Sequence, residues 1–66
     1  MTFEELRDRA IEHCQFLTDY VKENPEALKR SWIKVWAFFD IGLLTADEAM
    51  AWKDCMSRSA WEGGTK

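Results

Sequence analysis

The sequence predicts an all-α protein, a small three-helix bundle with helices over about residues 2–23, 25–41 and 46–61. Two observations carry this prediction. Apolar residues recur every three or four positions in each segment, and residues that begin or end helices separate the segments. Because 66 residues make one domain at most, we expect a single helical domain over 1–62 and a flexible tail over 63–66.

The first helix is predicted to begin at Thr2 and to end at about Glu23. Thr2 and Glu5 have the T-x-x-E spacing of a capping box, in which each side chain bonds the other residue's backbone amide. Phe16 projects about 40° beyond the apolar arc, so it either packs at the edge of the core or belongs to a contact surface. The apolar face itself consists of Phe3, Leu6, Ala10, Cys14, Leu17, Tyr20 and Val21, with His13 in the same arc.

The second helix follows almost without a linker and is apolar on nearly all sides. Asn24 is a favourable N-cap, Pro25 suits the first helical position, and Gly42 suits a left-handed C-terminal cap. We place this helix between the other two and expect them to cover only part of it. The predicted core stripe is Leu28, Trp32, Val35, Trp36, Phe39 and Leu43, and it competes for the core with Ile33, Ala37, Phe38 and Ile41.

The third helix is predicted to begin with a second capping box, formed by Thr45 and Glu48. Its inward stripe is narrow and consists mostly of small residues, which let a neighbouring helix approach closely. The stripe contains Ala49, Trp52, Met56 and Ala60, with Cys55 and Ser59 beside it.

The composition favours a soluble globular protein of a reducing compartment, which we expect to be cytoplasmic. A hydrophobic content of 47% and four tryptophans argue against disorder. The N-terminal residues are acidic and lack the apolar core of a signal peptide. The longest apolar-rich run is about thirteen residues and includes Lys34 and Asp40, so it is too short and too charged to span a bilayer. Two cysteines are too few for a disulfide scaffold.

No catalytic residue, metal site or cofactor is predicted. His13 and Cys14 are consecutive, so their side chains point about 100° apart on a helix and cannot activate one another. A carboxylate-bridged metal site in a bundle requires Glu-x-x-His pairs that project inward. No glutamate stands three positions before His13, and the acidic residues of the first helix lie on its outward face: Glu5, Asp8, Glu12, Asp19 and Glu23.

By elimination, the sequence predicts a non-enzymatic protein-interaction module, a steric inhibitor or adaptor with a protein partner of unknown identity. Exposed apolar patches mark interfaces, and aromatic residues dominate interface energetics. In size and helical character the chain is similar to many accessory proteins of phages and mobile elements. A homodimer is also expected. The predicted partner-binding residues are Trp36, Phe38, Ile41 and Ile33 on the second helix, with Phe16 and Trp61 elsewhere.

The alternative hypothesis is a helix-turn-helix-like nucleic-acid-binding or regulatory protein. The segment from Phe38 to Thr45 loosely resembles the turn of that motif. Only the middle of the chain, residues 25–41, has more bases than acids, three (Lys29, Arg30 and Lys34) against two. The helix that would enter the groove opens with Asp47 and Glu48, which phosphates would repel. Nucleic acid is therefore not the expected partner.

Overall fold

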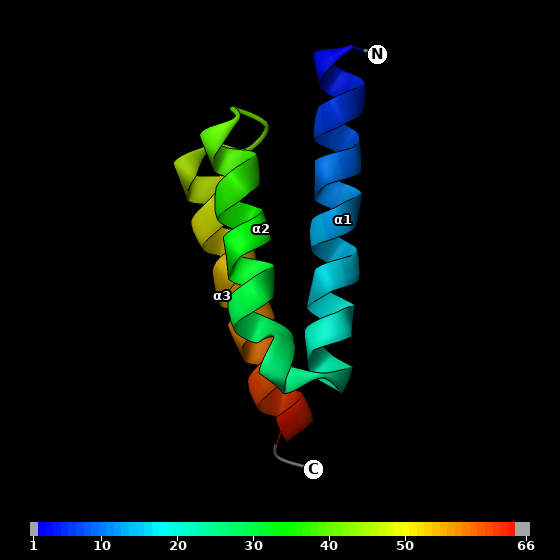
Figure 1. The fold of residues 1–66 in the computed structure, drawn as a ribbon, viewed down its shortest axis with the longest axis vertical. Coiled ribbons are helices and arrows are strands. Elements are labelled where there is room, and N and C mark those ends of the chain that lie inside the picture. The colour runs from blue at the N-terminus through cyan, green and yellow to red at the C-terminus, as the bar shows by residue number, and fades with distance from the viewer. Residues whose placement is uncertain (1, 65–66) are drawn as a thin grey trace.

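A computed structural model describes residues 2–64. It contains α1 (Phe3–Glu23), α2 (Leu28–Asp40) and α3 (Ala46–Gly64), with a short 3₁₀ helix, η1 (Pro25–Ala27), between α1 and α2 (Figure 1). The predicted fold class, an all-α three-helix bundle, is confirmed. α3 continues three residues past its predicted end. Residues 65–66 of the predicted tail lie outside the described residues, and the flexibility of the tail stays a prediction.

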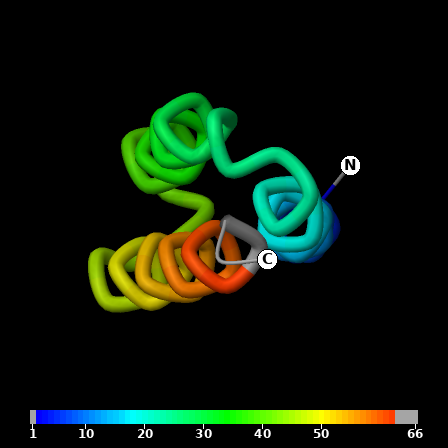
Figure 2. The backbone as a smooth tube through the Cα atoms, turned by 90° about the horizontal axis from the view of Figure 1, so that it is seen from below, coloured from blue at the N-terminus to red at the C-terminus, as the bar shows by residue number. Residues whose placement is uncertain are grey.

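α3, and not α2, is the central helix, so the predicted placement of α2 between the other two was wrong. α1 and α2 each pack along α3, whereas α1 and α2 approach one another at few positions. Viewed end-on, the three helices stand at the corners of a triangle (Figure 2). The buried face of α3 carries Ala49, Met56 and Ala60. Two of these side chains are methyl groups, so neighbouring backbones can come close.

The core is the set of side chains that the helices enclose around this face of α3. Phe3 and Leu6 were predicted to belong to it but are exposed. Figure 1 shows the reason, because the first turns of α1 extend beyond the turn that joins α2 to α3. The buried residues are Ala10, Cys14, Leu17, Val21, Ala27, Ser31, Val35, Leu43, Leu44, Ala49, Met56 and Ala60.

The buried face of α2 matches the predicted stripe except at Trp36. Leu28, Trp32 and Phe39 pack against the core, and Val35 and Leu43 are buried. Ser31 is also buried, and Phe38 also packs against the core, whereas Trp36 is 37% exposed. Ser31 satisfies its hydroxyl within the helix, since its Oγ donates to the Ala27 carbonyl at 3.1 Å. The serine therefore occupies the core without an unsatisfied polar group. The spacing of apolar residues could not predict this burial, because serine is polar.

The helix starts at Thr2 and Thr45 are confirmed, but their caps differ. At Thr45 both halves of the capping box form: the Glu48 amide donates to Thr45 Oγ1 at 3.2 Å, and the Thr45 amide donates to Glu48 Oε1 at 3.0 Å. Glu48 also accepts an ion-paired hydrogen bond from Arg7 of α1. At Thr2 the structure shows only the bond that its hydroxyl accepts from the Glu5 amide, at 3.2 Å.

Asn24 was predicted to cap the start of the second helix, and this was wrong. Its side chain makes no bond to the amides that follow. Its side-chain Nδ2 and its backbone N–H both donate to the Tyr20 carbonyl, at 3.2 and 2.9 Å. Asn24 therefore caps the end of α1, and the chain enters α2 through the 3₁₀ turn that Pro25 begins.

Gly42 ends α2 as predicted, in the left-handed conformation with φ +83°. The Leu43 N–H donates to the Phe38 carbonyl at 2.9 Å and the Gly42 N–H to the Phe39 carbonyl at 3.0 Å. These two bonds are the Schellman pattern. They turn the chain back so that Leu43 and Leu44 are buried beneath the turn.

We expect Thr45→Ala to lower the free energy of unfolding by about 1 kcal/mol, and Thr2→Ala to lower it by less. Each substitution removes the one bond that the threonine hydroxyl accepts. At Thr45 that bond holds Glu48, which Arg7 also ties to α1, whereas Thr2 lies at an exposed helix end. Urea unfolding followed by circular dichroism measures both. Equal losses would contradict this difference between the two helix ends.

The left-handed turn at Gly42 predicts opposite effects for the two mirror forms of alanine. Nothing lies within 4 Å of a Cβ placed there, so only the backbone conformation decides. L-alanine should cost about 1–2 kcal/mol. D-alanine, introduced by chemical synthesis, should not destabilise, because a positive φ suits it and it restricts the unfolded chain. Thermal unfolding of both proteins tests this, and similar melting temperatures would disprove it.

Candidate interaction surfaces

The outward side of α2 carries three of the predicted partner-binding residues. Ile33 and Ile41 are 67% and 68% exposed, and Trp36 is 37% exposed with its ring edge-on to Phe39 at 5.7 Å. Ile33 and Ile41 lie two turns apart on the helix, with Ala37 between them, so they form one row. We refer to Ile33, Trp36 and Ile41 as the outer face of α2.

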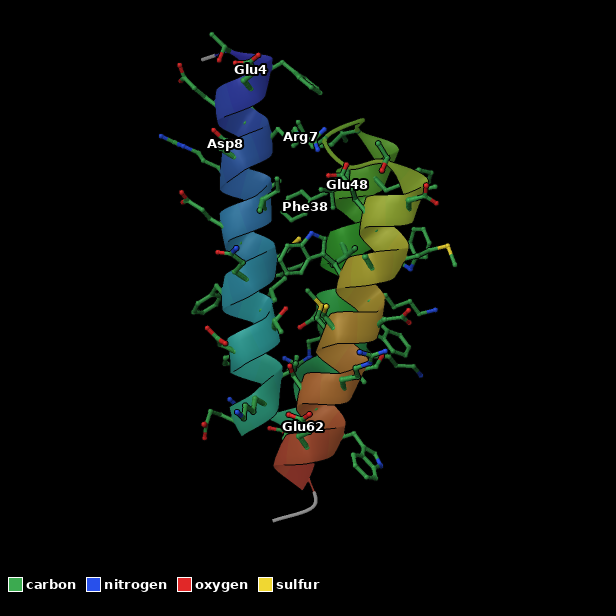
Figure 3. All side chains as sticks on the ribbon, turned by 180° about the vertical axis from the view of Figure 1, so that it is seen from behind. Glu4, Arg7, Asp8, Phe38, Glu48 and Glu62 are labelled. Atoms are coloured by element: carbon green, nitrogen blue, oxygen red, sulfur yellow. The ribbon has the colours of Figure 1, made fainter. Side chains whose placement is uncertain are left out.

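Phe38 does not belong to this outer face. It lies between α1 and the other two helices, as Figure 3 shows, and is half-buried. Its ring meets the His13 ring edge-on, with 5.8 Å between the centroids. Phe38 therefore faces α1, whereas Trp36, two positions earlier on the helix, is partly exposed to solvent.

The remaining two predicted contact residues lie elsewhere. Trp61 is 72% exposed near the end of α3, beside Arg58. Phe16 is 59% exposed on α1, on the side that faces α2. The six predicted residues therefore do not form one surface. The structure brings together Ile33, Trp36 and Ile41, and it places Phe16 in a different site.

That site is a groove of about 210 Å³ between the end of α1 and the start of α2. We call it the α1–α2 groove. Its lining consists mainly of three pairs of side chains, each pair one helical turn apart: Phe16 with Tyr20, Ala27 with Ser31, and Arg30 with Lys34, together with Leu17. The groove exists because Ala27 and Ser31 are small where the two helices face one another.

The aromatic wall of the groove is part of a continuous row of rings. Tyr20 stacks on Phe16 and Phe16 stacks on His13, each with 6.0 Å between centroids and interplanar angles of 21° and 26°. His13 then meets Phe38 across the helix interface. The row therefore starts on the surface at Tyr20 and ends in the half-buried contact between α1 and α2.

Sequence reasoning missed Tyr20, Arg30 and Lys34 as members of one site. Tyr20 was assigned to the core of α1, but it is exposed. Arg30 and Lys34 were weighed only as general basic residues. The only signal was the spacing of Arg30 and Lys34, which lie one turn apart, as do the small residues Ala27 and Ser31.

The thiol and imidazole at His13 and Cys14 do not form a reactive pair. Cys14 is fully buried, and desolvation raises the pKa of its thiol to about 11. A cysteine nucleophile requires the opposite shift. Cys55, predicted to lie beside the inward stripe of α3, is exposed.

The described part of the chain shows neither a metal cluster nor a membrane span. Within residues 2–64, histidine, cysteine and acidic side chains do not gather in a group of three that could hold a metal ion. No helix in that range has the length and apolar character that crossing a bilayer requires. Glu48 is part of a helix cap, and the hydrogen bond from the Thr45 amide, followed by the Thr45 hydroxyl and Arg7, lowers the pKa of its carboxyl.

The resemblance of residues 38–45 to a helix-turn-helix does not extend to the structure. In that motif the two helices cross at about 90–120°. Here α2 and α3 run antiparallel side by side, as an αα-hairpin (Figures 1 and 2). The start of α3 is also tied to α1 through Glu48 and Arg7.

Comparisons of the chain with protein-family models, with curated proteins and with solved structures find no match.

The two thiols should react at very different rates. At neutral pH, N-ethylmaleimide should label Cys55 rapidly and leave Cys14 unlabelled, because Cys14 is fully buried and its pKa is raised to about 11. Mass spectrometry of peptides after timed quenching measures this. In urea both should react alike, which serves as the control. Comparable rates in the native protein would show that α1 does not stay packed against the core.

Proposed function

We propose that this protein is a small non-enzymatic protein-interaction module that uses the outer face of α2. The observation that carries the proposal is the exposure of Ile33 and Ile41, 67% and 68%, in one row beside Trp36. Contiguous apolar side chains on the surface of so small a domain mark a contact site. A large aromatic side chain next to them is typical of an interface anchor.

The mechanism would be steric. A helix face presented on a bundle needs little ordering on binding, so less of the contact energy is lost. Occupying a partner's surface in this way would make the protein an inhibitor or an adaptor. Pairing of two outer faces would give a homodimer with a two-fold axis, in which the same residues meet on both sides.

The experiment compares Ile33→Gln/Ile41→Gln with a matched control, Phe3→Gln/Met50→Gln. Phe3 and Met50 are also strongly exposed apolar residues, but they lie on α1 and α3. Glutamine keeps helix propensity, and all four side chains lie outside the core, so both variants should retain the circular dichroism of the parent. The readouts are the solution mass by light scattering at two concentrations and the set of proteins retained by the immobilised chain.

We expect the parent and the control variant to behave alike, and the α2 variant to lose either the dimer or a retained partner. A loss of the dimer would identify self-association as the use of the outer face. A parent that is monomeric, and that retains the same proteins as the α2 variant, would refute the proposal.

A further inference from the structure

The α1–α2 groove has a chemistry that the outer face of α2 lacks. One wall is aromatic, the floor is small and partly polar, and the opposite wall carries two cations one turn apart. Ligand sites combine an apolar lining with a few charged or polar groups that fix orientation. The groove has both elements, so its shape and charge restrict what it can accept.

The volume of the groove suits a single large side chain. Small-molecule sites typically measure roughly 300–1,000 Å³, and this groove measures about 210 Å³. The groove is therefore smaller than a typical small-molecule site. Phe16 and Tyr20 stay substantially exposed although they stack on one another. An incoming apolar side chain would therefore meet rings that are already ordered.

The charge of the groove favours a carboxylate beside that side chain. Within residues 2–64, neither Arg30 nor Lys34 forms an ion pair, in contrast to Arg7, which is paired with Glu48. Both cations are exposed at the rim, where a carboxylate can reach them without losing all of its water. A bidentate contact from the guanidinium is the stronger of the two interactions available.

A nucleic-acid strand fits this groove less well than a protein segment does. Stacking rings and cations together can bind single strands, but such sites need a basic track along the backbone. Glu12 and Asp19 are exposed one turn to either side of Phe16, and Glu23 follows one turn further on. These acids would repel a chain of phosphates that runs along α1, whereas a single carboxylate needs to reach only Arg30 and Lys34 on α2.

We propose that the α1–α2 groove binds a protein segment in which a large apolar side chain stands next to an acidic residue. The apolar side chain enters between Phe16 and Ser31, and the carboxylate pairs with Arg30 and Lys34. This site is separate from the outer face of α2, so it goes beyond the proposed function and does not depend on it.

The probe is a short peptide with blocked ends in which one leucine is flanked by glutamates, and the matched peptide has glutamines instead. Titration of the isotope-labelled protein, followed by amide chemical shifts, suits the millimolar affinity expected for one side chain and two exposed charge contacts. We expect saturable shifts at Phe16, Tyr20 and Ser31. The glutamine peptide should bind roughly fivefold more weakly or worse, which is the effect of losing two exposed ion pairs.

Two protein variants with the same change in charge locate the contact. Arg30→Gln/Lys34→Gln should weaken binding of the acidic peptide by roughly fivefold. Arg9→Gln/Lys29→Gln removes two exposed cations outside the groove lining and should leave binding within about twofold, because long-range charge effects are screened by salt. Phe16→Ala should weaken the binding of both peptides, since it removes part of the aromatic wall.

Four outcomes would overturn the proposal. The first is the absence of groove shifts at millimolar peptide, and the second is equal binding of both peptides. The third is tighter binding of an oligothymidylate at the same amides, with a steep loss on adding salt, which would assign the groove to nucleic acid. The fourth is a change in the chemical shifts of the groove amides when the protein is diluted without peptide, which would show that a second copy of the chain covers the groove.

Discussion

The close approach that α3 allows on its small-residue face determines the rest of the bundle. Ala49 and Ala60 present only methyl groups, and Met56 is fully buried between them. Both other helices pack against this face, so the aromatic side chains left between α1 and α2 must share the third interface. His13 and Phe38 occupy one part of it. Where small residues, Ala27 and Ser31, face α1 instead, the interface stays open and becomes the α1–α2 groove.

This arrangement leaves α2 with two surfaces of different character. Its outer face is apolar and convex, and suits a broad contact in which burial of area supplies the affinity. The groove beside it is narrow and combines rings with cations, and suits the selection of one side chain by shape and charge. The two sites share a helix but no residue. The outer face could therefore supply most of the affinity for a partner, and the groove could select the partner. In known interfaces, too, a few residues supply most of the binding energy.

The local signals in the sequence predicted the helices and most of the buried stripe of α2, but not which helix is central. The caps at Thr2 and Thr45 and the turn at Gly42 are encoded by neighbours along the chain, so they were predictable. Periodicity placed Trp36 in the core and missed Ser31, which is buried because its hydroxyl bonds to its own helix. Ile33 and Ile41 were predicted to be contact residues, because the second helix has more apolar surface than the other two helices can cover. The groove was not predicted, because its walls come from two helices whose rotation only the packing against α3 decides.

The placement of the aromatic residues makes the bundle its own optical reporter. All four tryptophans lie on the hairpin, Trp32 and Trp36 on α2 and Trp52 and Trp61 on α3, whereas the only tyrosine, Tyr20, lies on α1. Excitation energy absorbed by Tyr20 can therefore reach an indole only across a helix interface. Separation of α1 from an intact hairpin would restore tyrosine emission while the helical signal persists, and global melting would change both together.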